Sequence, residues 1–234
     1  MTMLKISELT KKYGDFLAND KISLHIKKGL IYGFVGENGA GKTTLIRQIT
    51  SLSSPTDGKI IWNNNDKINI GFAQDIPMLP NDMSAYSAIT TYNHYLKLEN
   101  VDVESTLQMV GLDNARKPIK KLSLGMKKRV SLAIALLGNP EIVILDEPFN
   151  GLDPMGIKDF RQLIMDINRN DKTTFIICSH AVNELIKMCD VIEVICKGKV
   201  IQEINLGELD DMSIEHKESH IISILERGKN SDFQ

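Results

Sequence analysis

Apolar and polar residues alternate in short stretches along the first third of the chain, a pattern typical of β-strands. These stretches lie around residues 3–8, 21–25, 30–35, 58–62 and 67–73. A helical pattern over about residues 41–51 interrupts them. The first third therefore predicts several strands and one helix.

Between about residues 81 and 120 the pattern becomes helical. Residues 82–98 and 103–112 have the spacing of helices, and Pro80 and Gly111 are turn signals. We interpret this region as a helical insert between two parts that are richer in strands.

Predicted helices and strands alternate in the second half. A helix from residue 124 to Leu137 is stopped by Gly138 and Pro140. The elements expected after it are a strand at 142–145, a helix at 156–168, a strand at 173–179, a helix at 181–189, and strands at 191–196 and 199–204. This alternation predicts a parallel sheet covered on both faces. After Leu206 the sequence is polar, and we expect a loose helix or partial disorder there.

Composition narrows the class of protein. The chain has 234 residues, of which 42% are apolar and 25% charged, so it fits one large globular domain or one domain with a small insert. The net charge of −2 provides no positive field for nucleic acid, and we expect no nucleic-acid partner. Cys178, Cys189 and Cys196 lie in apolar stretches, which predicts buried thiols in a reducing cytoplasm.

Apolar runs in this chain are short. The longest, such as LAIALL and IVIL, fall far below the roughly 18 residues that span a bilayer. The first residues, MTMLKISELTKKYG, lack the apolar run of a signal peptide. We therefore expect a soluble chain, and any membrane-spanning segments would come from another chain.

Residues 35–45 read VGENGAGKTTL and fit the phosphate-loop pattern G-x-x-x-x-G-K-[ST] between an apolar strand and a helix. Gly36 and Gly41 let backbone N–H groups turn towards phosphate oxygens, and the helix N-terminus adds positive potential. Lys42 is expected to reach the β- and γ-phosphates, and the Thr43 hydroxyl to bind Mg²⁺. The alternative is a chance glycine-rich turn.

Two acids follow the apolar stretch IVIL in the sequence IVILDEP. Asp146, at the end of the strand, is expected to hold Mg²⁺ through water. Glu147 is placed to take a proton from the attacking water. The alternative is an ordinary acid pair that faces solvent.

Three more polar residues follow strands or turns. His180 comes directly after FIICS, at the carboxyl end of a strand where phosphate-loop proteins bind ligand, and we expect it to contact the γ-phosphate. Gln74 ends a strand before the helical insert, from where it could reach Mg²⁺ or the water. Asp153, in FNGLDP, is by itself a helix N-cap.

The segment LSLGM at residues 122–126 begins a helix. Ser123 is a favourable N-cap, but Gly125 in the first turn costs about 1 kcal/mol relative to alanine. We interpret the glycine as a place where a phosphate approaches the free N–H groups. Because the chain already has a phosphate loop, a second clamp makes sense if two copies face each other and each closes on the other's nucleotide.

With these motifs in this order, the chain resembles the nucleotide-binding subunit of ATP-binding cassette (ABC) transporters, from Met3 to about Leu206. The LSLGM segment stands where the family usually has LSGGQ, so that Leu124 and Met126 depart from the family pattern. The resemblance also implies that Tyr13 stacks on adenine, with an ordinary edge-strand aromatic as the alternative.

The resemblance implies three sets of site residues. The nucleotide is bound by Tyr13, Gly36, Glu37, Asn38, Gly39, Ala40, Gly41, Lys42, Thr43, Thr44, Ser123, Gly125 and Asp153. The catalytic residues are Glu147, His180 and Gln74. The metal ligands are Thr43, Gln74 and Asp146.

The fold implied is α/β: a RecA-like P-loop NTPase core with a mainly parallel sheet, an N-terminal antiparallel β subdomain and an α-helical subdomain. The boundaries expected are residues 1–206 for the ATPase domain, with the helical subdomain inserted at about 81–135, and residues 207–234 for a C-terminal tail.

The function implied is ATP binding and hydrolysis, with Mg²⁺, in a homodimer or with a related cassette. Such a subunit lies in the cytoplasm on the inner face of the membrane and drives a separate permease. The LSLGMKKR wording is similar to drug- and peptide-antibiotic exporters of the bacitracin-resistance kind, while Gln74 argues against lantibiotic-immunity subunits, which often have Glu there. The alternatives are an ABC ATPase that acts on ribosomes or DNA, a phosphate-loop kinase or GTPase, and a regulatory cassette without turnover.

Overall fold

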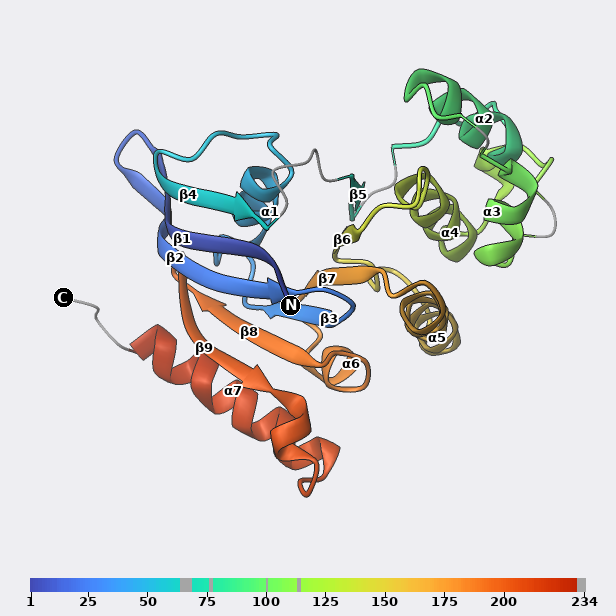
Figure 1. Ribbon diagram of the computed structural model, residues 1–234. Coiled ribbons are helices and arrows are strands. Elements are labelled where there is room, and N and C mark those ends of the chain that lie inside the picture. The colour runs from blue at the N-terminus through green and yellow to red at the C-terminus, as the bar shows by residue number, and fades with distance from the viewer. Residues whose placement is uncertain (64–68, 76–77, 100, 113–114, 231–234) are drawn as a thin grey trace. The chain divides into compact units, whose positions relative to one another are not determined.

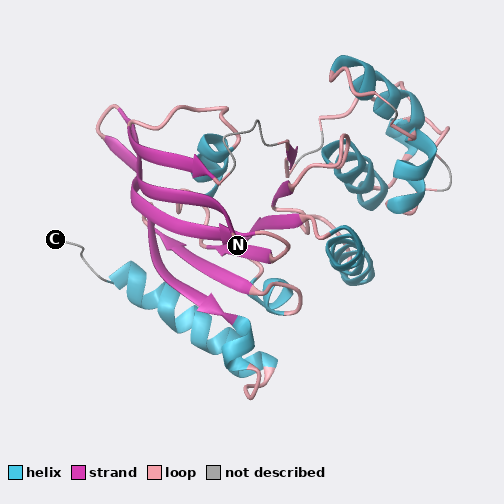
Figure 2. Cartoon of the chain, viewed as in Figure 1, coloured by secondary structure: helices cyan, strands magenta, loops and turns pink. Residues whose placement is uncertain are grey.

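The computed structural model describes residues 1–63, 69–75, 78–99, 101–112 and 115–230 (Figures 1 and 2). The chain divides into two compact units. Unit 1 comprises residues 1–68 and 174–234, and unit 2 comprises residues 69–173. Unit 2 is therefore one continuous stretch of sequence, whereas unit 1 is assembled from both ends of the chain.

An antiparallel sheet in unit 1 has the strand order β2-β1-β4. Its strands are β1 (Thr2–Tyr13), β2 (Phe16–Lys27) and β4 (Asp57–Trp62). Leu4 and Ile6 are buried, and a shift of register between Ile6 and Leu9 returns Leu9 to the buried side. Because this shift breaks the period of two, the sequence predicts only the shorter strands 3–8 and 21–25. The predicted N-terminal antiparallel sheet is confirmed.

The second sheet of unit 1 has the order β7-β3-β8-β9 (Figure 1). Its strands are β3 (Ile31–Val35), β7 (Thr174–Ser179), β8 (Val191–Cys196) and β9 (Lys199–Asn205). β3 pairs in parallel with β7 and β8, and β9 pairs antiparallel with β8. β3, β7 and β8 are buried along their whole length, as expected for strands covered on both faces. The predicted parallel arrangement is confirmed.

The C-terminal segment forms helix α7 (Ile214–Asn230), after a 3₁₀ turn at Leu206–Leu209. α7 packs against β8, β9 and the short helix α6 (Val182–Ile186) (Figure 1). Ile221 and Ile224 are buried. The helix expected in this segment is present, but it is packed rather than loose. Its polar residues form the solvent face of an amphipathic helix.

Unit 2 contains a parallel strand pair and four helices among its described residues. They are β5 (Ile70–Ala73), α2 (Ala85–Tyr95), α3 (Val103–Met109), α4 (Leu124–Ala135), β6 (Ile142–Asp146) and α5 (Pro154–Asp171), with a 3₁₀ turn at Ile119–Lys121. α2, α3 and α4 pack against one another, so the helices expected in this region are present (Figure 1). Part of the strand expected at 67–73 lies outside the described residues.

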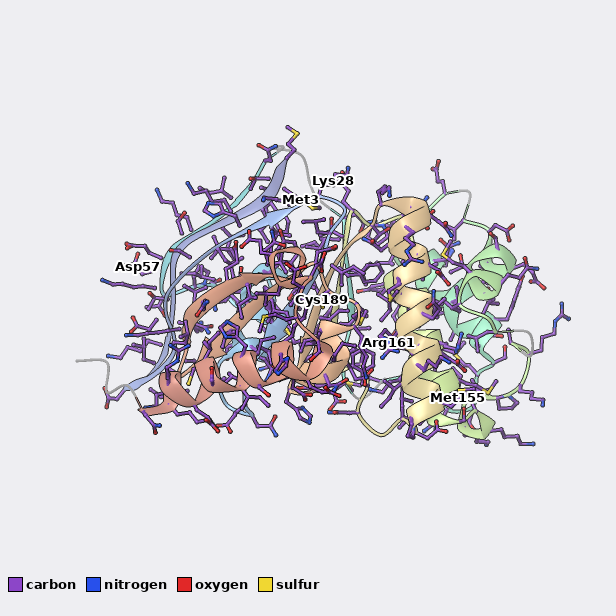
Figure 3. All side chains as sticks on the ribbon, turned by 90° about the horizontal axis from the view of Figure 1, so that it is seen from below. Met3, Lys28, Asp57, Met155, Arg161 and Cys189 are labelled. Carbon is purple, nitrogen blue, oxygen red and sulfur yellow. The ribbon has the colours of Figure 1, made fainter. Side chains whose placement is uncertain are left out.

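The three cysteines are buried thiols, as the sequence predicts. Figure 3 marks Cys189 within unit 1, where a Cβ added to Gly33 would lie 3.0 Å from its Sγ. Burial raises the pKa of the Cys189 thiol well above its usual range, which makes it a poor nucleophile. Along the described parts of the chain, no helix combines the length and the apolar character that crossing a bilayer requires.

Candidate nucleotide-binding and catalytic site

Residues 36–41 form a loop between β3 and helix α1 (Lys42–Ile49). Gly39 and Gly41 have φ angles of 84° and 101°, which residues with a Cβ disfavour. Gly41 is the N-cap of α1 and has no side chain that could cap the first turn. An anion at this helix N-terminus would be stabilised by the helix dipole and by the backbone N–H groups of the first turn. The strand–loop–helix context that the sequence predicts is present.

The loop is held by tight packing and by two buried amides. A Cβ on Gly36 would overlap the backbone of β8, and one on Gly41 would lie 2.5 Å from the Ala18 carbonyl oxygen. Nδ2 of the fully buried Asn19 donates to the Gly41 carbonyl (3.1 Å), and Nε2 of Gln48 donates to Oδ1 of Asn19 (2.7 Å). Sequence reasoning missed Asn19 and Gln48, because neither stands in a recognisable motif.

Lys42 is buried against its own loop, where Nζ donates to the carbonyl oxygens of Gly36 (2.6 Å) and Glu37 (3.1 Å). A pocket of about 680 Å³ is lined by the loop residues Gly36, Glu37 and Asn38 and by His180, which follows β7. His180 itself is exposed. The structure therefore brings the predicted histidine to the pocket that the phosphate loop lines.

Helix α7 contributes to the same pocket. Nζ of Lys229 lies 2.6 Å from Oε1 of Glu37 in the phosphate loop. On helix α6, which follows His180, Nδ2 of Asn183 donates to Oε2 of Glu218 on α7 (2.9 Å). Sequence reasoning missed both contacts, since it treated the segment after Leu206 as a tail.

Tyr13 lies at the end of β1 with 48% of its surface exposed. Nζ of Lys11 stands 5.0 Å from the centre of its ring, a cation–π contact that leaves the ring largely open. Thr43 is exposed and Thr44 is half-buried in the first turn of α1. The exposed ring is suited to stacking on a planar group, and its position also fits an ordinary aromatic at the end of a strand.

In unit 2, β6 is apolar and buried as far as Asp146, which is half-buried. Glu147 follows with a φ of 45°, in the left-handed region that residues other than glycine rarely adopt. Its carbonyl oxygen accepts a hydrogen bond from the Asn150 N–H (3.3 Å), which closes the turn. Both acids thus stand at the carboxyl end of a parallel strand, as predicted.

A buried lysine connects this turn to the segment after β5. Lys128, on α4, is 4% exposed, and its Nζ donates to the carbonyl oxygens of Glu147 (3.0 Å) and Asp75 (3.1 Å). Nζ also lies 3.5 Å from Oδ1 of Asp75. Burial lowers the pKa of the Lys128 ammonium group, and the charges of Asp75, Glu147 and Asp146 oppose this shift. Asp75 directly follows Gln74, whose side chain is exposed.

Ser123 is the N-cap of α4, and its Oγ accepts a hydrogen bond from the Met126 N–H (3.2 Å). A Cβ on Gly125 would approach only Cδ2 of Leu152, at 3.6 Å, which is ordinary van der Waals contact. The capping role of Ser123 is therefore present, whereas packing among the described residues gives no reason for a glycine at Gly125.

Asp153 is the N-cap of α5, and its Oδ1 accepts from the Gly156 N–H (3.2 Å). Just before it, Gly151 has a φ of 74°, and a Cβ there would lie 2.6 Å from Cδ2 of Leu124. The turn therefore packs on the start of α4. Met155, marked in Figure 3, is exposed in the first turn of α5. The capping interpretation of Asp153 thus holds in the structure.

A family model described as ABC transporter matches residues 19–150, which is more than half of the chain. The chain belongs to the ABC transporter family. It is accordingly an ATP-binding, ATP-hydrolysing cassette of a transporter, as its motifs predict.

Two of the relatives in this family are named for the transport of an antibiotic. The bacitracin transport ATP-binding protein BcrA of Enterococcus faecalis is 38% identical, over 88% of this chain and 70% of its own length. The lantibiotic transport ATP-binding protein SrtF of Streptococcus pyogenes is 38% identical, over 86% of this chain and 90% of its own. YcbN of Bacillus subtilis, an uncharacterized ABC transporter ATP-binding protein, is 37% identical, over 92% of this chain and 74% of its own.

Solved ABC cassettes have the same fold. The cassette cbiO1 of Clostridium perfringens, part of the ABC transporter complex cbiONQ, superposes with a TM-score of 0.82 at 28% identity and covers 97% of this chain and 98% of its own. A dimeric ATP-binding cassette in a post-hydrolysis state, bound to ADP and Pi, has a TM-score of 0.76 at 26% identity, over 87% of this chain and 99% of its own.

Proposed function

We propose that the protein hydrolyses ATP between two facing cassettes and thereby drives export of a peptide antibiotic through a separate permease. The observation that carries the two-cassette arrangement is the unfilled space beside Gly125, which is partly exposed. The fold of unit 2 would tolerate a side chain there, since the nearest atom is 3.6 Å from the added Cβ. A glycine in the first turn of a helix costs about 1 kcal/mol relative to alanine. A ligand that approaches the helix N-terminus from outside the chain explains why glycine stands at this position.

The nucleotide is held mainly by the phosphate loop. The backbone N–H groups of residues 36–44 surround the phosphates, and Lys42 moves from the carbonyl oxygens of its own loop to the β- and γ-phosphates. Tyr13 offers its exposed ring to adenine. From the facing cassette, Ser123 and Gly125 bind the γ-phosphate, and Asp153 lies at the same interface.

The oxygen donors of this chain fit Mg²⁺, which prefers hard oxygen ligands. They are the Thr43 hydroxyl, the Gln74 amide oxygen and the Asp146 carboxylate. The ion held by these residues would supply positive charge that offsets the negative charge of phosphoryl transfer. Glu147 accepts a proton from the attacking water, Gln74 orients that water, and His180 donates to the γ-phosphate.

The substrate class rests on the relatives. Two of them, at 38% identity, are named for transport of bacitracin and of a lantibiotic. Both are peptide antibiotics, so we assign this cassette an amphipathic peptide substrate. Because the described helices do not span a bilayer, the peptide crosses through another chain.

The permease is expected to dock on the helical part of unit 2. A pocket of about 420 Å³ there is lined by residues of the α2–α3 region, including Tyr86, Leu107 and Arg116. An amphipathic cytoplasmic helix of the permease would place apolar side chains in such a pocket. Such docking would hold the protein at the cytoplasmic face of the membrane.

A mixing experiment tests the two-cassette site. Lys42→Ala impairs the phosphate loop and Ser123→Arg fills the space of the facing γ-phosphate, so each variant alone is inactive as a homodimer. A heterodimer of the two has one site with both defects and one intact site. We expect mixing to restore measurable ATPase activity.

Two controls make the mixing experiment decisive. Isolated Ser123→Arg monomer should bind ATP with nearly wild-type affinity in calorimetry, because its own phosphate loop is intact. If it fails to bind ATP while remaining folded, Ser123 acts within its own chain. Absence of recovery in a mixture shown by gel filtration to form heterodimers would also refute the arrangement.

A further inference from the structure

Lys128 is a buried cation of unit 2 for which the nucleotide motifs provide no role. It belongs to α4, five positions after the N-cap Ser123, and only 4% of its surface is exposed. Its ammonium group has three donors. These face the carbonyl oxygens of Asp75 and Glu147 and the carboxylate of Asp75, at 3.1, 3.0 and 3.5 Å.

The two acceptors come from segments far apart in the sequence. Asp75 follows β5 and directly succeeds Gln74, whereas Glu147 follows β6. β5 and β6 are neighbouring parallel strands, with Ala73 opposite Leu145. Lys128 therefore joins the two strand ends from which the proposed water-orienting and proton-accepting side chains extend.

The backbone of Glu147 needs such support. Its φ of 45° costs free energy for a residue with a Cβ, and surrounding contacts must maintain it. Its carbonyl oxygen receives one hydrogen bond from the next turn and one from the Lys128 ammonium group. A charged donor makes the stronger hydrogen bond of the two, so Lys128 contributes much of the restraint on this backbone.

We infer that Lys128 is a positioning residue for ATP hydrolysis, which fixes the backbone of Glu147 relative to the segment that carries Gln74. This inference rests on the proposed role of Glu147. Because the same ammonium group binds both segments, a displacement of the Asp75 backbone is transmitted to Glu147. Because Lys128 belongs to α4, it also links both segments to the helix that begins with the LSLGM segment.

The test compares three variants of the full chain. Lys128→Met keeps an unbranched chain that ends where the lysine Cε lies, and it removes every donor. Lys128→Gln keeps amide donors on a shorter side chain, which reaches one carbonyl but not both. The matched control is Lys120→Met, which removes an ion pair with Asp82 (2.6 Å) on the surface of the same unit.

We measure kcat and KM for Mg-ATP, with circular dichroism to establish the folded fraction. Lys128→Met should lower kcat by roughly tenfold to a hundredfold, the effect of a small misplacement of a catalytic group, and leave KM within about threefold. Lys128→Gln should give an intermediate kcat, and Lys120→Met should match the wild type. If Lys128→Met folds and has a wild-type kcat, the inference is wrong. If Lys128→Met does not fold, a wild-type kcat in Lys128→Gln overturns the inference instead.

A double-variant cycle separates positioning from general destabilisation. If Lys128 acts through Glu147, adding Lys128→Met to Glu147→Gln should not lower the single-turnover rate further. An equal decrease in both backgrounds would overturn the inference. Wild-type turnover by Glu147→Gln alone would refute the proposed role of Glu147. This result needs no Lys128 variant, so failure of the proposed function is distinguishable from failure of the inference.

Discussion

Glu147 combines an unusual backbone with a carboxylate at the end of a parallel strand. Glu147→Gln preserves the shape of the side chain and removes the base. Loss of a general base typically lowers the rate by about 10²–10⁴-fold, and we expect that loss in steady-state ATPase activity. ATP should still bind, and gel filtration with ATP should show an accumulated dimer because hydrolysis no longer opens it. Wild-type turnover would contradict the assignment.

Met126 is the fifth residue of the LSLGM segment, and its backbone N–H, not its side chain, donates to Ser123. A methionine side chain cannot donate a hydrogen bond. We therefore expect Met126→Gln to leave ATPase activity within a few-fold of the wild type. A complete loss of turnover in a folded Met126→Gln protein would show that the apolar side chain is required at this position.

Among the strands, β8 carries a buried acid. Burial, and next the charge of Glu203 opposite on β9, raise the pKa of Glu193 to about 8 from a usual value of 4.5. The folded protein thus holds a proton that the unfolded chain releases above pH 4.5. Glu193 is accordingly expected to destabilise the fold increasingly as pH rises from about 4.5 to about 8, by up to about 1.4 kcal/mol per pH unit.

Glu193→Gln tests this expectation, because the amide remains neutral at every pH. The free energy of unfolding in urea, measured at pH 5.5 and at pH 8, should decrease less between these values in the variant than in the wild type. Glu203→Gln leaves Glu193 buried but removes the charge that contributes to its raised pKa, so the pH dependence of this variant should lie between those of the wild type and Glu193→Gln. Identical pH dependence in wild type and Glu193→Gln would contradict the assigned pKa.

The sequence predicts the helices and strands whose apolar pattern is uninterrupted, such as β6 and β7. It missed the full length of β1 and the packed helix α7, where register shifts and many polar residues obscure the period. It also missed Lys128, although a signal was present: Lys128, Leu132 and Ala135 share one helical face, and the latter two are buried.

For the whole molecule, the phosphate loop and the strand-end residues could be located because each motif stands directly beside a predictable strand or helix. The supporting contacts could not, because they join polar residues that are distant in sequence. Asn19 with Gly41 and Lys229 with Glu37 are examples. Neither pair has a spacing or a residue type that marks it before the chain is folded.

The transport role predicts a phenotype of the whole cell. Deleting the protein should lower, by several-fold, the concentration of bacitracin or of a lantibiotic that inhibits growth of its host. Complementation with the wild type should restore resistance, and complementation with Glu147→Gln should not. If the deletion strain instead loses uptake of a nutrient, the export direction is wrong.

The discontinuous make-up of unit 1 has a consequence for synthesis on the ribosome. β3 lies between β7 and β8, yet β7 begins about 140 residues after β3 ends. At roughly 5–20 residues per second, the nascent chain therefore carries the apolar strand Ile31–Val35 without its partners for about 7–30 s. Unit 2, one continuous stretch, is complete before β7 emerges. The nascent chain thus has a long interval in which a chaperone that binds exposed apolar strands would protect its N-terminal part.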